Sequence, residues 1–247
     1  MTRPLLKTFL CLLMLPLGYD SFSQLTDTSF VSLASANAVK KYRTFIQGQS
    51  GLYSGSEYRL PRLTNEDHPF YIEHDWFEGS VQYNGETYDD THLMYDLTTD
   101  NIIIEHFYNG QSIVLVRAKV EGFTMRNDRF IHLNGTALLP GLPGAGFYRV
   151  LHDGESRLLA KYVKQPDEKI ENNKVEVYFP QRTRYYLLKD DTYHKVSSRG
   201  DLLKVFHDRK QDVRHYISDH KLKFSKDNPA AFAAVASYYD SLNPEKK

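Results

Sequence analysis

The chain has little cysteine and no excess of charge of either sign. Its one cysteine, Cys11, lies in an N-terminal segment that we expect to be removed, so the mature chain has no thiol for a disulfide, a cysteine-ligated metal site or a cysteine nucleophile. Lys and Arg number 31, as do Asp and Glu, and this balance predicts no nucleic-acid partner. The composition, 41% hydrophobic over 247 residues, is that of a globular protein with enough material for a core.

Apolar runs of membrane-spanning length are also absent. The first apolar run, residues 9–17, follows two basic residues and precedes the small residues Ser21 and Ser23. This pattern predicts that residues 1–23 are a secretory signal peptide, cleaved before Gln24. A spanning helix needs about 20 apolar residues. We therefore expect an exported protein, periplasmic or extracellular, with no transmembrane segment in the mature chain.

The two parts of the mature chain differ in charge. Residues 24–148 hold 9 basic and 15 acidic residues, and residues 149–247 hold 20 and 15, so the net charges are −6 and +5. Such asymmetry can indicate an anionic partner for the basic part. Because no basic run exceeds two residues, we favour solvated helix faces or a contact between the two parts.

The order of the patterns predicts an α+β fold, with residues 24–247 in a single β-rich domain. Residues 29–47 show helical spacing. Residues 70–196 alternate β-rich runs with turn residues, and residues 199–242 return to helical spacing.

Turn dipeptides recur through the β-rich part. Asn84-Gly85, Asn109-Gly110 and Asp153-Gly154 each separate two β-rich runs, as do residues 99–101 and 189–191. Asn-Gly and Asp-Gly favour type I′ hairpin turns, in which both central residues need positive φ. Hairpins in series predict a mainly antiparallel meander.

Two kinds of strand are predicted. Residues 102–104 and 113–116 are apolar throughout and predict strands covered on both faces. Residues 174–179 alternate, which predicts that Val175, Val177 and Phe179 face inward. The mixture favours a curled sheet or a partly closed barrel, covered in part by helices.

The C-terminal part is predicted to be a helical hairpin. Ser198 and Asp201 form a start that resembles a capping box, and Asn228-Pro229 starts a second helix. Apolar residues recur at helical spacing through residues 199–242, so we expect these helices to bury one face on the sheet or on each other.

One arrangement in the β-rich part could hold a metal or act in hydrolysis. His74 lies between Glu73 and Asp75, and Asp90 and His92 share a strand face in the next hairpin arm, so a cross-strand site from His74, Asp90 and His92 is conceivable. Solvated hairpin edges, where Asp and His are common, are the simpler explanation.

The C-terminal helices offer weaker candidates. His207, Gln211 and His215 lie at i, i+4 and i+8, whereas two ligands on one helix normally lie one turn apart, as in the absent His-Glu-x-x-His motif. Asp208 and Asp212 have basic neighbours and predict a salt-bridged outer face. No nucleophile motif such as Gly-x-Ser-x-Gly occurs. The sequence therefore assigns no catalytic, metal-binding or cofactor-binding residue, and no cofactor.

Glycines and aromatic residues have structural explanations. Residues 140–146 hold the richest glycine cluster, but they precede a predicted strand and no lysine follows, which favours a connecting loop over a phosphate cradle. The chain has 18 Tyr and 14 Phe, and adjacent pairs such as Tyr185-Tyr186 and Tyr238-Tyr239 favour packing within the sheet and core over stacking on a sugar or base.

A family resemblance rests on turns and aromatic residues. The leader that ends in Ser-Gln, the segments 77–85, 93–96 and 146–154, and the tail with Tyr238-Tyr239-Asp240 resemble those of uncharacterised exported proteins of Bacteroidota. The resemblance covers most of the mature chain. It implies no activity and no functional residue.

These observations favour an exported, non-enzymatic binding or envelope-associated protein, whose partner is an unknown envelope protein or a small ligand. Two alternatives stay open. The continuous apolar strands and the glycine-rich loop also suit a barrel-type carrier of a small apolar ligand. A hydrolase would use His74, Asp90 and His92.

Overall fold

A computed structural model describes residues 32–35, 51–106, 108–171, 173–225 and 228–242. The chain divides into two compact units, Met1–Phe45 and Ile46–Lys247. In the first unit, residues 32–35 are helical. The predicted signal peptide and the other residues of the predicted 29–47 helix lie outside the described residues, and these predictions stay predictions. All that follows concerns the second unit.

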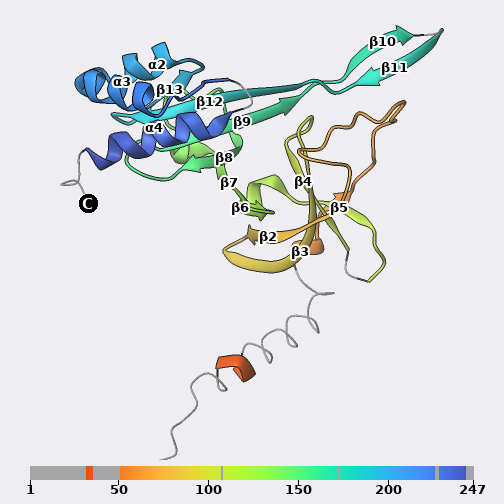
Figure 1. The fold of residues 1–247 in the computed structure, drawn as a ribbon. Coiled ribbons are helices and arrows are strands. Elements are labelled where there is room, and N and C mark those ends of the chain that lie inside the picture. Colours follow the sequence, from red (N-terminus) through yellow and green to blue (C-terminus); the bar gives the residue numbers. More distant parts are fainter. Residues whose placement is uncertain (1–31, 36–50, 107, 172, 226–227, 243–247) are drawn as a thin grey trace, which may run out of the picture. The chain divides into compact units, whose positions relative to one another are not determined.

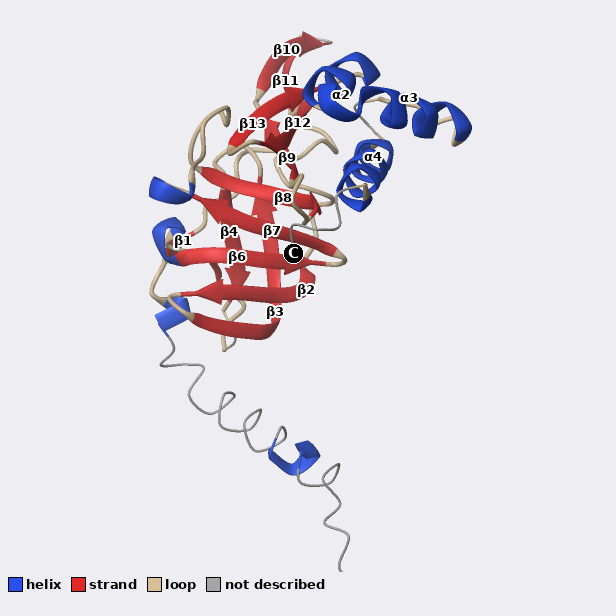
Figure 2. Cartoon of the chain, turned by 90° about the vertical axis from the view of Figure 1, so that its left-hand side faces the viewer, coloured by secondary structure: helices blue, strands red, loops and turns tan. Residues whose placement is uncertain are grey.

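Most of the described part of the second unit is one antiparallel sheet (Figure 1, Figure 2), which confirms the predicted fold class. Its eleven strands lie in the following order across the sheet: β1 (Ser56–Glu57), β5 (Ser112–Val114), β4 (Asn101–Glu105), β3 (Glu86–Asp96), β2 (Phe77–Tyr83), β6 (Val120–Met125), β7 (Asp128–Leu133), β8 (Gly146–His152), β9 (Leu158–Lys164), β12 (Gln181–Lys189) and β13 (Thr192–Val196).

Two meanders meet where β2 pairs with β6. Strands β2 to β5 run from this junction toward the β1 edge, and β6 to β9 run from it toward β12 and the β13 edge. The predicted meander is therefore interrupted once, between β5 and β6, in a connection that contains the short 3-10 helix Arg117–Lys119. Because β1 and β13 are separate edges, the sheet does not close into a barrel. The prediction was a curled sheet or a partly closed barrel, and the structure has an open sheet.

The open sheet is nevertheless strongly curled. The ring centroid of Tyr95 on β3 lies 5.9 Å from that of Phe147 on β8. In a flat sheet the four strand spacings between β3 and β8 would place them about 19 Å apart. The Lys164 N–H at the end of β9 also donates to the Leu97 carbonyl, just after β3, at 3.3 Å. The curl therefore encloses the main core within the concave face.

Large apolar side chains fill this concave face. Phe123 and Phe130 stack at 4.5 Å between ring centroids, near its centre. On β4, Ile102 and Ile104 belong to the main core, whereas Ile103 faces a smaller cluster on the other side of the sheet. All three isoleucines are buried, which confirms the prediction that this strand is covered on both faces.

The hairpin turns follow the local sequence. Asn84 and Gly85 have φ values of 54° and 80°, and Asp190 and Asp191 have φ values of 49° and 55°. Positive φ at both central positions is the requirement of a type I′ turn. The predicted hairpins β2–β3 and β12–β13 are therefore confirmed.

Three helices follow β13 in the described part of the chain, where two were predicted: α2 (Arg199–Val205), α3 (Lys210–Asp219) and α4 (Pro229–Ser241). The first predicted helix is interrupted at Phe206, which leaves the helical path (φ −90°, ψ 45°) and stacks on Tyr239 at 3.9 Å. Both predicted starts are confirmed, because the Asp201 N–H donates to Ser198 Oγ and α4 begins at Pro229.

The apolar faces of these helices are buried in the main core, on the sheet or on each other as predicted: α4 packs on β8 and β9, α2 packs on β13, and α3 packs on α2 and α4. Phe232 of α4 lies 4.9 Å from Tyr185 of β12, measured between ring centroids. No helix among the described residues is both long enough and apolar enough to cross a membrane.

The chain segment that connects β9 to β12 forms a separate two-stranded ribbon, made of β10 (Asp167–Glu171) and β11 (Lys174–Tyr178) (Figure 1). Ile170 and Val175 lie opposite each other and are 79% and 54% exposed. The predicted inward orientation of Val175 is therefore wrong, whereas Phe179, just after β11, is buried. Alternation places Val175 and Val177 on one face but does not supply a layer to cover that face.

Candidate ligand-binding recess

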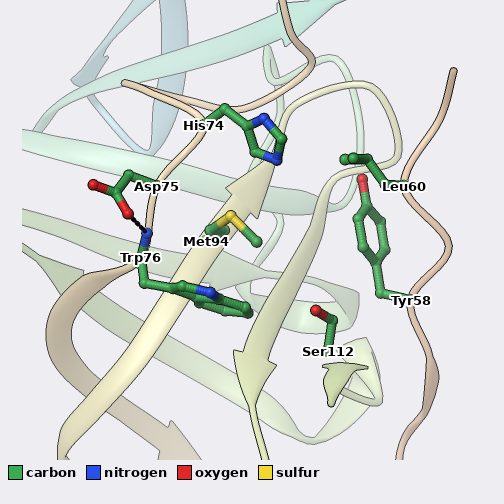
Figure 3. Close-up of a pocket in the computed structure, with 7 residues that line it drawn as sticks. All are labelled: Tyr58, Leu60, His74, Asp75, Trp76, Met94 and Ser112. Carbon is green, nitrogen blue, oxygen red and sulfur yellow. Dashed lines mark hydrogen bonds between the residues drawn. The ribbon is translucent and has the colours of Figure 1, made fainter. Parts of the chain in front are cut away.

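A recess of about 200 Å³ lies on the face of the sheet opposite the main core, near the β1 edge (Figure 3). It is open to solvent on one side. Four segments that are distant in sequence line it: Tyr58 and Leu60 after β1, His74–Trp76 before β2, Met94 on β3 and Ser112 at the start of β5.

The strand register explains the floor of the recess. Met94 pairs with Ile103, and Ile103 pairs with Val114, so these three residues form a row across β3, β4 and β5. Their side chains point away from the main core because neighbouring residues in a strand face opposite sides. Phe70 covers part of the row and is buried with Met94 and Ile103 in a small apolar cluster. Trp76 packs on the same cluster and is partly buried.

Aromatic rings form the walls. Figure 3 shows His74, Trp76 and Tyr58 on three sides of the recess, with Met94 between them. The His74 ring stacks on Phe70 at 4.9 Å with an interplanar angle of 19°, which fixes its orientation. Tyr58 lies beside Phe70 at 6.2 Å between ring centroids.

A buried carboxylate holds the Tyr58 ring in place. The Tyr58 hydroxyl donates to Asp96 Oδ2 at 3.1 Å. Asp96 is 1% exposed and also accepts bonds from the Thr98 N–H at 2.8 Å and from the hydroxyls of Thr98 and Thr99 at 2.7 and 2.8 Å. Burial, followed by the negative charge of Asp96, raises the pKa of Tyr58 well above its usual value. The hydroxyl therefore stays protonated and continues to donate to Asp96.

Asp75 shapes the rim. Its carboxylate accepts a hydrogen bond from the Trp76 N–H at 2.8 Å, and Figure 3 shows this carboxylate turned toward that N–H. Such a contact between an Asp side chain and a following N–H favours a turn. It positions the backbone from which the Trp76 ring extends into the wall.

The recess is built mainly from the most acidic part of the chain. Residues 51–106 contain 12 Asp and Glu and two Arg, Arg59 and Arg62, which gives a formal net charge of −10. None of the seven lining residues is Lys or Arg. Ring faces, a thioether and a surrounding negative charge suit binding by contact and electrostatic attraction rather than acid–base chemistry.

The structure does not bring together His74, Asp90 and His92. His74 lines the recess, whereas His92 Nδ1 lies 2.9 Å from Glu105 Oε2, and Asp90 is an exposed residue of β3 with a φ of 52°. Within the described ranges, no group of three or more His, Cys, Asp or Glu is placed to hold a metal ion.

The C-terminal candidates are also separated. His207 lies in a 3-10 turn, whereas Gln211 and His215 lie in α3, so the three do not form a stripe on one helix. Asp208 is exposed and salt-bridged, as predicted, but its partner is Lys189 of β12, at 3.6 Å, and not a neighbour on its own helix, and it also accepts a hydrogen bond from the Tyr239 hydroxyl at 2.6 Å.

A serine, a histidine and an aspartate meet near the turn after β8. His152 Nε2 lies 2.7 Å from Asp240 Oδ2, and the Ser156 N–H donates to Asp240 Oδ1 at 3.0 Å. The Ser156 hydroxyl has no hydrogen-bond partner among the described residues, but it is buried and Ser156 is 1% exposed, so a substrate has no access to it. The cluster attaches α4 to the turn between β8 and β9.

A second recess, of about 350 Å³, lies between residues 61–64 and the β10–β11 ribbon. Val175, Val177 and Phe179 form its apolar side. The Val177 N–H donates to Thr64 Oγ1 at 2.7 Å, which attaches the ribbon to the chain segment opposite. None of the polar residues in its lining, Arg62, Thr64, Thr98 and Glu168, is buried.

The glycine-rich segment 140–146 is a connection, as predicted. It joins β7 to β8, and the Pro140 carbonyl accepts a hydrogen bond from the Tyr193 N–H on the β13 edge at 2.8 Å. A Cβ at Gly141 would overlap with the Tyr193 carbonyl, and its φ of +90° also favours glycine. The segment therefore passes along the β13 edge.

Sequence reasoning singled out His74 but missed Tyr58, Trp76 and Met94. Their separation in sequence hides the recess, since only the pairing of β1, β3, β4 and β5 brings them together. One signal was present: Trp76 is the sole tryptophan of the chain, and it follows two polar residues at the start of a strand.

No family model, no curated protein and no solved structure matches the chain. The resemblance to exported proteins of Bacteroidota therefore stays a prediction.

Proposed function

We propose that this protein is an exported binding protein and that the recess beside Trp76 is its site for a small ligand. One observation supports this site above all: three rings surround an apolar floor that remains open to solvent. Concave sites with apolar walls and a few polar groups are the usual form of small-ligand sites.

A panel of neutral sugars, amino acids, organic acids and organic cations tests the site. Binding is measured by the shift in unfolding temperature and by the emission of Trp76, which as the only tryptophan reports on the recess directly. We expect one chemical class to bind.

A blocking variant gives the control for this panel. Ser112→Phe places a ring in the recess and should abolish binding, while Ser237→Phe, the same change at an exposed position of α4, should leave it intact. If no compound gives a signal that Ser112→Phe removes, the recess is not a ligand site.

Export is a separate part of the proposal and rests on the pattern of residues 1–23. Expression of the full chain should yield a processed protein outside the cytoplasm that begins at Gln24. Mass spectrometry of the recovered protein measures this directly. An intact N-terminus on protein retained in the cytoplasm would rule out export.

The β10–β11 ribbon supports a second candidate function, attachment to another envelope protein. Ile170 and Val175 form an exposed apolar pair, and a two-stranded ribbon has little stability alone. The double substitution Ile170→Ser and Val175→Ser should move the protein from the envelope fraction to the soluble fraction. Val116→Ser, at an apolar residue that is 41% exposed elsewhere, should leave its distribution unchanged.

The barrel-type carrier and the hydrolase lack comparable support. The carrier depended on a closed barrel, and the sheet is open. The hydrolase depended on His74, Asp90 and His92 acting together, and His92 contacts Glu105 instead.

A further inference from the structure

We propose that the recess binds a quaternary ammonium group, as in a small organic cation with a trimethylammonium head. This inference rests on the proposed function, because it names the ligand class of the same recess. It depends on three properties of the recess: its size and rings, its charge, and the shortage of hydrogen-bonding groups in its lining.

Size and shape favour one compact group. A volume of about 200 Å³ is below the range of about 300–1,000 Å³ that is usual for drug-sized ligands. The rings of Tyr58, His74 and Trp76 stand on three sides, and Met94 forms the floor (Figure 3). Rings around a compact cation attract it through the negative potential of their faces, and tryptophan is the strongest of them.

Charge favours a cation over a neutral group. The segment 51–106 has a formal net charge of −10, and no lysine or arginine lines the recess. Asp96 lies behind Tyr58 and accepts its hydroxyl proton in a hydrogen bond at 3.1 Å. Donation to a carboxylate increases the electron density of the Tyr58 ring, which strengthens its attraction for a cation.

Lys164 only partly offsets this negative charge. Its ammonium group donates to the His68 carbonyl at 2.6 Å, and burial lowers the pKa of Lys164, although the charges of Asp67 and Asp96 act in the opposite direction. Asp67 and Lys164 carry opposite charges, whereas Asp96, behind Tyr58, is held by neutral donors.

The lining favours a cation without N–H groups. A primary ammonium or a sugar needs several hydrogen-bond partners once water is removed. The Tyr58 hydroxyl is already bound to Asp96, and the Asp75 carboxylate accepts from the Trp76 N–H. Two oxygen acceptors remain in the lining, Asp75 Oδ2 and the Ser112 hydroxyl, which are too few for the three N–H groups of a primary ammonium or the several hydroxyls of a sugar. A trimethylammonium group requires no such partner and matches this lining.

Four small probes test the inference on the full chain after purification. Choline is compared with its neutral carbon analogue 3,3-dimethylbutan-1-ol, with ethanolamine and with glucose, using Trp76 emission and calorimetry. Choline should bind saturably and at least about tenfold more tightly than either the neutral analogue or ethanolamine. Equal binding of the neutral analogue, or binding of glucose in place of choline, overturns the inference.

The outcome separates this inference from the proposed function. Binding of another chemical class that Ser112→Phe abolishes overturns the quaternary ammonium ligand and retains the recess as a site. A failure of every probe, and of the wider panel, overturns both.

Variants provide a second test that depends on the rings. Tyr58→Leu should weaken choline binding at least about tenfold, whereas Tyr108→Leu, which removes a 66% exposed ring that does not line the recess, should not change it. Asp96→Asn should weaken binding severalfold while the Tyr58 ring stays in place. If Tyr58→Leu does not fold, Asp96→Asn decides, and unchanged choline affinity in that variant overturns the role of the negative charge.

The source of the group is resolved by a vesicle experiment. Vesicles of phosphatidylcholine are compared with vesicles of phosphatidylethanolamine in a flotation assay. Binding to free choline alone supports a soluble ligand, and additional selective binding to phosphatidylcholine supports a lipid headgroup. Equal binding to both vesicles, without binding of free choline, overturns the inference.

Discussion

Asp96 and Asp100 lie at the two ends of the connection between β3 and β4, and each accepts a hydrogen bond from a tyrosine hydroxyl, but they differ in what balances their charge. Asp96 accepts bonds from Tyr58 and from the neutral groups of Thr98 and Thr99. Within the described part of the chain, no Lys, Arg or His forms a salt bridge with Asp96 within 4 Å. Asp100 instead lies 2.8 Å from the ammonium group of Lys161.

The groups of the Asp100 cluster are bonded to one another. Lys161 Nζ also donates to the Phe147 carbonyl at 3.0 Å, the Tyr95 hydroxyl donates to Asp100 Oδ1 at 2.5 Å, and the Phe147 N–H donates to Asp100 Oδ2 at 3.3 Å. These bonds join β3 and the turn before β4 to β8 and β9. The cluster therefore stabilises the curl of the sheet and offers no position for a ligand.

The difference shows how one motif serves two purposes. A carboxylate that is paired with a cation, as Asp100 is with Lys161, links distant strands and attracts other charged groups only weakly. A buried carboxylate with neutral donors keeps its charge, and at Asp96 this charge lies behind a ring that faces the recess. The first arrangement predicts large effects on stability, and the second predicts effects on binding.

The largest effect is expected from Lys161→Met. This change leaves Asp100, whose side chain is 20% exposed, without its cation, and we expect it to lower the free energy of unfolding by about 3 kcal/mol, the lower end of the range for fully buried pairs. Lys164→Met is the matched control, because Lys164 is equally buried but donates to a carbonyl, and it should lower stability by only about 1–2 kcal/mol. Denaturant unfolding measures both. Equal losses in the two variants would show that Asp100 and Lys161 do not act as a clamp.

The next effect compares Asp100→Asn with Asp96→Asn. At Asp100, either orientation of the amide directs its NH₂ group at a donor, because Oδ1 receives Lys161 and Oδ2 receives the Phe147 N–H. At Asp96, Oδ2 receives two hydroxyls, from Tyr58 and Thr99, and both can rotate to accept.

Asp100→Asn should therefore lower the free energy of unfolding by about 2–3 kcal/mol and Asp96→Asn by about 1 kcal/mol or less. The same denaturant measurement checks both values. A reversed order would contradict this account of the two carboxylates.

Local sequence predicted the hairpins and one of the two doubly covered strands, since these depend on neighbouring residues. The second such prediction, for residues 113–116, is wrong, because β5 ends at Val114 and Val116 is 41% exposed. Asn84-Gly85 requires only its own backbone to form a type I′ turn, and three consecutive isoleucines at 102–104 indicate burial on both faces without knowledge of any partner. The start of α2 was likewise predictable, because Ser198 and Asp201 are three residues apart.

The recess and the Asp100 cluster were not predictable in this way. Asp100 and Lys161 are 61 residues apart, and Tyr58 and Asp96 are 38 apart. Their contacts follow from which strands pair and how strongly the sheet curls, and neither property is encoded in a single segment. For the same reason the alternation of Val175 predicted a face correctly and its burial incorrectly.

A smaller effect is expected from Gly146→Ala. A Cβ at Gly146 would overlap with Asp100 Oδ2 and lie 2.7 Å from Lys161 Nζ. Gly144 has nearly the same φ, +149° against +147°, but a Cβ there meets no atom within 4 Å. Both variants share the backbone strain, so the difference between them isolates the collision with the Asp100 cluster.

We expect Gly146→Ala to be about 1–2 kcal/mol less stable than Gly144→Ala in denaturant unfolding. Equal stabilities would mean that the cluster adjusts to the extra methyl group and does not act as a rigid clamp.

The smallest effect concerns pH and compares His68, whose carbonyl accepts from Lys164, with His132, which lies near Asp100. Burial, together with the charge of Lys164, lowers the pKa of His68, and burial chiefly lowers the pKa of His132. Since an unfolded histidine has a pKa of about 6.5, the unfolded state takes up protons first, and the free energy of unfolding falls as the pH decreases below about 6.5. Above that pH the contribution of both histidines is fully present.

The two histidines should contribute unequally to this fall. His68 Nδ1 accepts a hydrogen bond from the Phe70 N–H at 3.2 Å, and protonation replaces this acceptor with a second donor. His132 Nδ1 lies 2.8 Å from the Val120 carbonyl and already donates, so a proton added at Nε2 breaks no bond. His68→Gln should therefore flatten the decrease in stability between pH 8 and pH 5 more than His132→Gln does. If the free energy of unfolding of His68→Gln depends on pH as that of the unchanged protein does, protonation of His68 does not weaken the folded state. The contact between His68 and the Phe70 N–H would then not contribute to the pH dependence.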